Sequence, residues 1–278
     1  MILVNTIKIL FIILLLNFPL ASQVKQVSMQ LSLDFIIPYV GPINRLETLV
    51  FGPNIRHSTE KLEAERYYAK LLVNDHKGKI VDANNKSYYK YNIDDEEYWE
   101  IPFEKLLYKP RDDQLEKKDR KNRRSSWSMN FFDEENPVID IARDNKSDMI
   151  IFEKQSVKWV TTYTRENGDR LVIEEWSVKE FPELSIADSL NRSLDKYLGK
   201  PDSLIIPFGK GFSNLILNSS PGLHGKIPGK IIKANITSYE NNEDDPNFTM
   251  KMDLIRLDVE NFDENQFGIP NNFKEVKK

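Results

Sequence analysis

The sequence of 278 residues contains no cysteine. This absence excludes disulfide-stabilised scaffolds, thiolate metal sites, cysteine nucleophiles and lipidation on a cysteine. The net charge is -4 and the pI is about 5.6, so the composition gives no electrostatic support for nucleic-acid binding. With 40% hydrophobic and 29% charged residues, the chain has a globular rather than a disordered composition. The length suits one large domain or two small ones.

The sequence also lacks the motifs of common enzymes. The histidines, His57, His76 and His224, are far apart and have no metal-binding spacing. There is no Gly-x-Ser-x-Gly elbow, phosphate-binding loop or dinucleotide fingerprint. The acidic clusters 94–97 and 244–245 lie in predicted turns beside asparagine, which favours solvation and capping over glycosidase acids or a calcium site. We therefore expect a protein that is not an enzyme, with no cofactor, no metal and isolated surface imidazoles.

Residues 1–22 predict a signal peptide. One charge, Lys8, precedes the apolar run Ile9–Leu16, and the small residues Ala21 and Ser22 follow. This run is shorter than the about 20 residues that a membrane span needs, so the pattern favours a cleaved signal over a membrane anchor. No second long apolar run follows. We expect a periplasmic or secreted protein without a stable transmembrane anchor after processing.

Residues 23–278 are expected to form a single domain dominated by strands. Apolar and polar residues alternate from Val27 to Phe35, which places the apolar side chains on one sheet face. Asn84-Asn85 and the Asn167-Gly168 pair predict hairpin turns, the second of type I′. For 58–73 the pattern suggests a helix beginning at Ser58 and then a strand. Further strands are expected at 46–51, 79–82, 87–91, 98–103, 157–163, 171–178, 231–239 and 248–259.

One long helix is expected at Ile186–Leu198, with Ser185 as its cap and Gly199 as its stop. A single helical turn is expected at 263–267. The block at about 109–148 is rich in mixed charge and has few periodic apolar positions. We interpret this block as a charged insertion in a solvated loop, because acidic residues weaken the alternative of a basic site for nucleic acid or anionic lipid.

These elements predict a mainly β (α+β) fold, a curved antiparallel half-barrel sheet of about eight to eleven strands with one or a few helices on its concave face. The helical material is too small to cover such a sheet, so the sheet either closes as a barrel or leaves a partly covered groove. Both outcomes provide an apolar cavity, unless side chains fill it. The expected cavity wall consists of Met29, Leu31, Leu33, Phe35, Trp159, Trp176, Leu190 and Leu194.

An ordered series of segments also carries a resemblance to known proteins. The segments are Phe51–Arg56, Leu72–Asp82, Lys86–Tyr89, Ile173–Pro182 and Phe262–Pro270. They resemble an uncharacterised family of secreted bacterial proteins whose architecture is similar to that of the periplasmic lipoprotein carriers LolA and LolB. The resemblance implies a half-barrel with helices on the concave face and a binding or carrier role, and it supplies no catalytic residues.

Two functions follow as hypotheses. The first is a non-enzymatic periplasmic carrier-like protein that holds a lipid, a lipoprotein acyl chain or another apolar ligand in the curved sheet. The second is a structural or protein-interaction module of the cell envelope without a small ligand, in which the charged block engages an envelope protein partner. Nucleic acid is not an expected partner.

Overall fold

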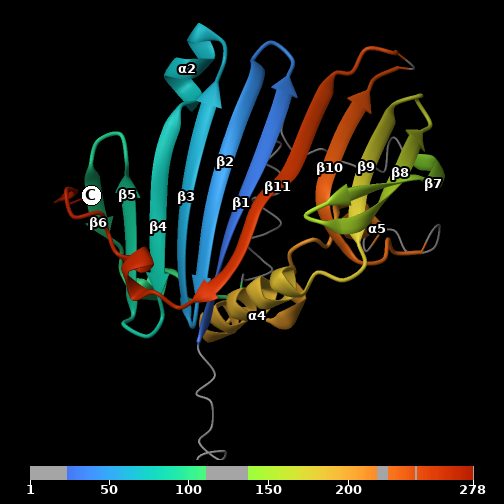
Figure 1. Cartoon of the computed structure of the whole chain (residues 1–278). Coiled ribbons are helices and arrows are strands. Elements are labelled where there is room, and N and C mark those ends of the chain that lie inside the picture. Colours follow the sequence, from blue (N-terminus) through green and yellow to red (C-terminus); the bar gives the residue numbers. More distant parts are fainter. Residues whose placement is uncertain (1–23, 111–136, 218–224, 242, 278) are drawn as a thin grey trace, which may run out of the picture.

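In the computed structural model, the described residues are 24–110, 137–217, 225–241 and 243–277, and they form one large sheet with few helices (Figure 1). The predicted signal peptide lies outside these residues. The strands are β1 (Lys25–Ile37), β2 (Gly41–Gly52), β3 (Ile55–Ala64), β4 (Asp75–Asp82), β5 (Ser87–Asn92), β6 (Glu97–Glu100), β7 (Val138–Ile151), β8 (Lys154–Arg165), β9 (Arg170–Val178), β10 (Lys230–Tyr239), β11 (Phe248–Asn261) and β12 (Lys274–Glu275). The helices are α2 (Tyr67–Val73), α4 (Pro182–Tyr197) and α5 (Phe212–Leu217), with single 3-10 turns η1 (Phe103–Lys105), η2 (Asp202–Leu204) and η3 (Glu264–Phe267). No helix in these ranges is long and apolar enough to cross a membrane.

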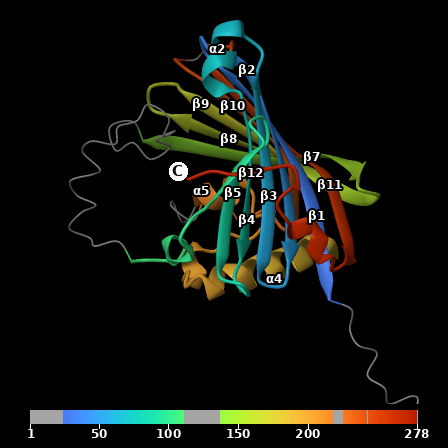
Figure 2. The same cartoon turned by 90° about the vertical axis from the view of Figure 1, so that its left-hand side faces the viewer.

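The twelve strands of the described residues are ordered β12-β6-β5-β4-β3-β2-β1-β11-β10-β9-β8-β7. Neighbouring strands are antiparallel, except that β12 pairs with β6 in parallel. The terminal strands β7 and β12 do not pair with each other, so the sheet is open. The turned view shows that the sheet curves around the side that carries α4 and α5 (Figure 2). The predicted curved antiparallel sheet is confirmed, and the barrel alternative is wrong.

The alternation in β1 separates two faces of the sheet. Met29 and Leu31 pack in the same core as α4, whereas Ser28 and Gln30 point the other way. We call the α4 side the inner face and the opposite side the outer face. Register shifts interrupt the pairing of β1 with β11 and of β10 with β9. Such bulges bend the strands and increase their twist.

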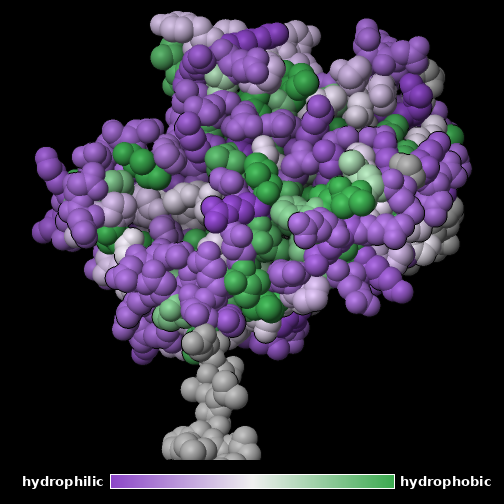
Figure 3. Space-filling view, viewed as in Figure 1, coloured by the Kyte–Doolittle hydropathy of each residue, from purple (hydrophilic) through white to green (hydrophobic). Residues whose placement is uncertain are grey.

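Polar residues cover most of the face of the molecule seen in Figure 3. Hydrophobic residues gather near its middle, over β7 and β11. Exposed Met149 and Ile150 of β7 and Ile255 of β11 belong to these strands. Most other large apolar side chains of β1 and β11 are turned toward the core, as expected for an antiparallel sheet with one face in water.

Helix α4 begins one turn earlier than predicted. Pro182 occupies its first turn, where proline fits because the missing N–H needs no partner. Ser185, the predicted cap, instead lies inside the helix and its hydroxyl donates to the Phe181 carbonyl. The predicted stop is confirmed, because Gly199 has a φ of 82° and its N–H bonds the Lys196 carbonyl while Lys200 bonds that of Asp195.

The prediction for residues 58–73 is wrong, because strand and helix are exchanged. Ile55–Ala64 is a central strand, although polar side chains occupy both of its faces. The apolar run Tyr67–Val73 is a short helix in the connection to β4, with Ala69 packed on Ile43 and Ala64 and with Tyr67 exposed. Tertiary pairing on both sides of β3 overrides its weak strand pattern.

Two further expectations are corrected. The charged block was expected to reach residue 148, but Val138–Ile151 forms the edge strand β7. The rest of the block, residues 111–136, lies outside the described residues.

The hairpin between β8 and β9 is confirmed, but positive φ occurs at Gly168 and not at Asn167. The Gly168 N–H bonds the Arg165 carbonyl, which is the pattern of a type I turn followed by a left-handed glycine.

The C-terminal segment after β11 covers the outer face of β3, β4 and β5. Its Phe273 ring contacts the buried ring of Tyr91 edge-on, with centroids 5.6 Å apart. Tyr91 pairs with Gly78 across β4 and β5, and its ring lies over that glycine. A Cβ at Gly78 would approach Tyr91 Cζ to 2.1 Å. Gly78 therefore provides the space in which the Tyr91 ring packs.

We predict that Gly78→Ala lowers the free energy of unfolding by about 1–3 kcal/mol, because the new methyl group displaces the Tyr91 ring. Urea unfolding followed by circular dichroism measures this change. Gly225→Ala is the matched control, since a Cβ there meets no heavy atom within 4 Å. Equal stability of the two variants would contradict this packing of Tyr91.

Candidate functional site

The inner face is divided into an apolar half and a charged half. Strands β1, β11 and β10 carry apolar residues there, such as Leu33 paired with Met252 and Phe35 paired with Met250. On the other side, Leu33 pairs with Arg45 of β2. From there to β5 the same face carries charges, which include Glu47, Glu60, Lys77, Lys79 and Lys90. The surface is therefore amphipathic across the strands.

Helix α4 covers the lower ends of the central strands and contacts β1, β2, β3 and β11. The α4 residues Leu184 and Ala187 are buried in the core between the helix and the sheet, and Leu190 of the helix packs against the same core. Further along the helix, Leu194 and Leu198 pack on Val81 and Tyr88 at the β4–β5 side. A single apolar stripe thus joins both halves of the inner face at this end.

Polar contacts also hold α4 in place. Arg56 Nη1 on β3 donates to Asn191 Oδ1 at 2.6 Å and lies 3.7 Å from Asp195 Oδ1. Burial lowers the pKa of the Arg56 guanidinium, and the charge of Asp195 opposes that shift. Asp188 accepts from the Phe208 N–H at 2.5 Å and pairs with Lys230. Two further contacts, of Glu183 with Lys154 on β8 and of Ser193 with Asn54 after β2, also join α4 to the sheet.

The predicted cavity-wall residues on β1 share the inner face. Met29 is buried in the core, while Leu31, Leu33 and Phe35 are only half-buried. Trp159 of β8 also faces inward, where its Nε1 donates to Ser177 Oγ at 2.9 Å. The two leucines predicted on the helix, Leu190 and Leu194, pack in the two separate clusters described above. The structure therefore distributes these residues over the inner face and does not gather them in one closed cavity.

Trp176 is the exception, because it lies on the outer face. It pairs with Lys158 on β8 and Lys233 on β10, and the ammonium groups of these lysines lie 4.9 and 5.5 Å from its ring centroid. Trp159 pairs instead with Glu175, the residue before Trp176. Successive residues of a strand point to opposite faces, so the placement of Trp176 in the cavity wall is wrong.

Glu175 is a fully buried carboxyl group that was not among the predicted site residues. Its Oε1 accepts hydrogen bonds from the backbone N–H groups of Phe212 at 2.6 Å and Ser213 at 3.3 Å, at the start of α5. Burial raises the pKa of the Glu175 carboxyl, and these hydrogen bonds and the charge of Arg143 oppose the shift. The side chain thereby fixes α5 on the sheet. Its signal in the sequence is a carboxylate at a position where the alternation of Leu171 and Ile173 predicts an apolar residue.

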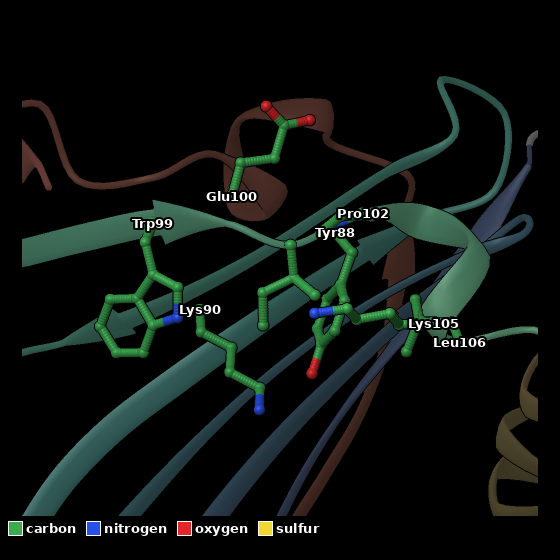
Figure 4. Close-up of a pocket in the computed structure, with 8 residues that line it drawn as sticks. Tyr88, Lys90, Trp99, Glu100, Pro102, Lys105 and Leu106 are labelled. Carbon is green, nitrogen blue, oxygen red and sulfur yellow. The ribbon is translucent and has the colours of Figure 1, made fainter. Parts of the chain in front are cut away.

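A pocket of about 450 Å³ lies at the β5–β6 end of the inner face (Figure 4). Its wall combines the aromatic rings of Tyr88 and Trp99 with the ammonium groups of Lys90 and Lys105. Lys90 Nζ lies 5.7 Å from the centroid of the Tyr88 ring. No local pattern in the sequence reveals this pocket, because residues from β5, β6 and η1 meet there only after the strands pair.

The histidines differ from the expectation of isolated surface imidazoles. His57 is half-buried on the outer face, where Nδ1 donates to the Gln266 carbonyl at 2.7 Å and Nε2 accepts from the Tyr91 hydroxyl at 2.5 Å. His76 Nδ1 lies 3.8 Å from Asp94 Oδ1. His224 lies outside the described residues. His57 thus connects the C-terminal segment to β3 and β5, and for this residue the expectation is wrong.

Comparison with solved structures returns proteins of low similarity to this chain. One is a LolA superfamily protein from Nitrosomonas europaea, with 8% sequence identity, a TM-score of 0.25 and coverage of 87% of this chain and 90% of that chain. Another is a putative outer membrane lipoprotein-sorting protein domain from Vibrio parahaemolyticus, with 7% identity, a TM-score of 0.25 and coverage of 87% and 88%. No protein-family model and no curated protein matches the chain. At these TM-scores the likenesses carry no argument about function, and the fold assignment rests on the sheet itself.

We predict that His57 makes stability depend on pH. Burial lowers the pKa of the His57 imidazole, although its bond to Gln266 opposes this shift. The unfolded chain then binds a proton more readily, so the contribution is complete above the unfolded pKa of about 6.5 and is lost as the pH falls. His57→Gln should lower stability at neutral pH by about 1 kcal/mol.

The same variant should also lose less stability than the wild type when the pH falls from about 7 to about 5. Urea unfolding at both pH values measures the difference between the two proteins. An identical pH dependence in both would show that His57 is not held neutral by the fold.

Proposed function

We propose that this protein is a non-enzymatic binding protein that holds a lipid or another apolar ligand on the inner face of its curved sheet. The observation that carries the proposal is the incomplete cover of that face. Leu33, Phe35 and Met252 are apolar and only half-buried, although Phe35 and Met252 also pack against buried clusters of the inner face. Apolar surface gains about 25 cal/mol for each Å² removed from water, so an acyl chain lying on these residues is stabilised.

The arrangement of α4 supports reversible loading. The helix presents an apolar stripe to the sheet and is held there by side-chain contacts and not by strand pairing. These contacts join Arg56 to Asn191 and Asp195, Lys230 to Asp188, Lys154 to Glu183 and Asn54 to Ser193. A shift of α4 enlarges the apolar surface without breaking any strand pairing. We propose that α4 is a movable cover and that ligand enters and leaves when it shifts.

The proposed setting is the periplasm or the exterior of a bacterial cell. This part of the proposal rests on the signal-peptide pattern of residues 1–22 and on the absence of cysteine. A lipid or a lipoprotein acyl chain is then the ligand class that an exported apolar site meets most directly.

Organic extracts of the purified, exported protein test the proposal by mass spectrometry. We expect a bound fatty species in stoichiometric amount, and a consistently empty protein that also fails to bind added fatty probes contradicts it.

We predict that Leu33→Gln weakens binding of a fluorescent apolar probe by about tenfold, because it places an amide in the apolar half of the inner face. Ser32→Gln is the matched control, since Ser32 is the neighbouring residue on the outer face. Fluorescence titration with N-phenylnaphthylamine measures both affinities. Equal weakening by the two substitutions, or by neither, would remove the apolar half of the inner face as the site.

A further inference from the structure

The pocket at the β5–β6 end is on the same face of the sheet as α4. Val81 pairs with both Arg56 and Tyr88, and Arg56 bonds to Asn191 of the helix. Lys90 pairs with Trp99 two residues further along these strands. The lining residues Tyr88, Lys90 and Trp99 therefore all belong to the inner face, at the end of its charged half.

The charge of this pocket is unbalanced. Lys90 lies directly opposite Lys79 on β4, and like charges in that position destabilise a sheet. Burial lowers the pKa of the Lys79 ammonium, and the charges of Arg56 and Lys90 lower it further, while those of Glu47 and Glu60 oppose the shift. Within the described ranges, no carboxylate lies at ion-pair distance from Lys79, Lys90 or Lys105.

The one acidic residue at the pocket does not neutralise these lysines. Glu100 pairs with Tyr89 and so belongs to the outer face of β6. Figure 4 shows that its carboxylate points away, whereas the side chains of Lys90 and Lys105 reach toward Tyr88 from opposite sides. The pocket thus presents two ammonium groups, and none of its described lining residues supplies a counter-ion to them.

The other walls of the pocket are apolar. Ile101 and Leu106 line it and also pack against the cluster that contains Tyr88, Leu194 and Leu198. This cluster lies beneath the C-terminal half of α4. A ligand in the pocket therefore touches cations with one part and the apolar cluster under the cover with another.

We propose that this pocket binds the negatively charged head group of an acyl-chain ligand, which makes the ligand class an anionic amphiphile. The inference rests on the proposed function and specifies its ligand. A carboxylate or a phosphate between Lys90 and Lys105 relieves the repulsion between Lys79 and Lys90. The volume of about 450 Å³ accommodates either group together with the first carbons of its chain.

The test compares ligands that share a sixteen-carbon chain and differ in the head group: palmitate, hexadecyl phosphate and hexadecanol. Affinities are measured by displacement of a fluorescent apolar probe from the full mature chain. We expect the preferred anion to bind about tenfold more tightly than the alcohol, and the tighter of the two anions identifies the head group. Lys90→Gln/Lys105→Gln should remove this preference and leave the affinity for hexadecanol unchanged.

Lys146→Gln/Lys251→Gln is the control, because it removes the same charge from exposed positions on β7 and β11. It should retain the preference for the anion. Thermal unfolding without ligand gives a second measurement, in which Lys90→Gln should raise the melting temperature because it ends the repulsion with Lys79.

The failures of the two proposals are distinguishable. Equal binding of all three ligands by wild type and variants overturns the head-group pocket and leaves the apolar site. Loss of the preference in the control pair overturns the pocket in favour of net charge. If none of the three ligands binds, the proposed function fails and the pocket assignment fails with it.

Discussion

The cost of exposing apolar surface to water is the constraint on which the structure depends. An open sheet of this width has two faces, and the alternation of β1 makes its inner face apolar at Met29, Leu31, Leu33 and Phe35. In the described part of the chain, α4 and α5 are the helices placed on that face. Helix α4 covers one end of the central strands, and a second buried cluster with Ile173, Ile236 and Met250 lies further along the inner face. Leu33, Phe35 and Met252 stay only half-buried. The proposed binding surface is the part of the inner face that α4 and α5 leave half-buried.

Polar groups position the cover with more precision than apolar packing alone. Asp188, Asn191 and Asp195 lie on α4 and each contacts a residue outside the helix, while Glu175 fixes α5 from the sheet. Buried hydrogen bonds are directional and are costly to leave unmade, so they define where each helix lies. The Lys79–Lys90 pair has the opposite character, because it is a cost that the unliganded fold retains. Natural binding sites commonly retain unfavourable interactions of this kind, and a bound ligand relieves them.

The sequence predicts the elements whose signals are local. The strand at β1, the hairpins around Asn167-Gly168 and at β10–β11, and the glycine stop of α4 each follow from a period or a turn residue, and the structure has them. The exchange of strand and helix in residues 58–73 has a physical reason, since β3 is paired on both sides and carries charges on its inner face. Its strand state comes from its neighbours and not from an apolar alternation.

Site residues are harder to predict, because a change of one position turns a side chain to the other face. Trp159 and Trp176 illustrate this point, since both lie on strands but only Trp159 faces inward. The pocket at Tyr88 and Lys90 and the partners of His57 depend on residues far apart in the chain, so no local pattern reveals them.

The most direct test is to determine which face of the sheet the acyl chain of a bound ligand contacts. A fatty acid with a nitroxide label near its methyl end broadens the NMR signals of methyl groups close to it. We expect broadening at the inner-face residues Leu33 and Met252, with sharp signals from Leu46 and Val50 on the outer face of β2. Broadening of the outer-face methyl groups, or no selective broadening at all, would contradict this expectation.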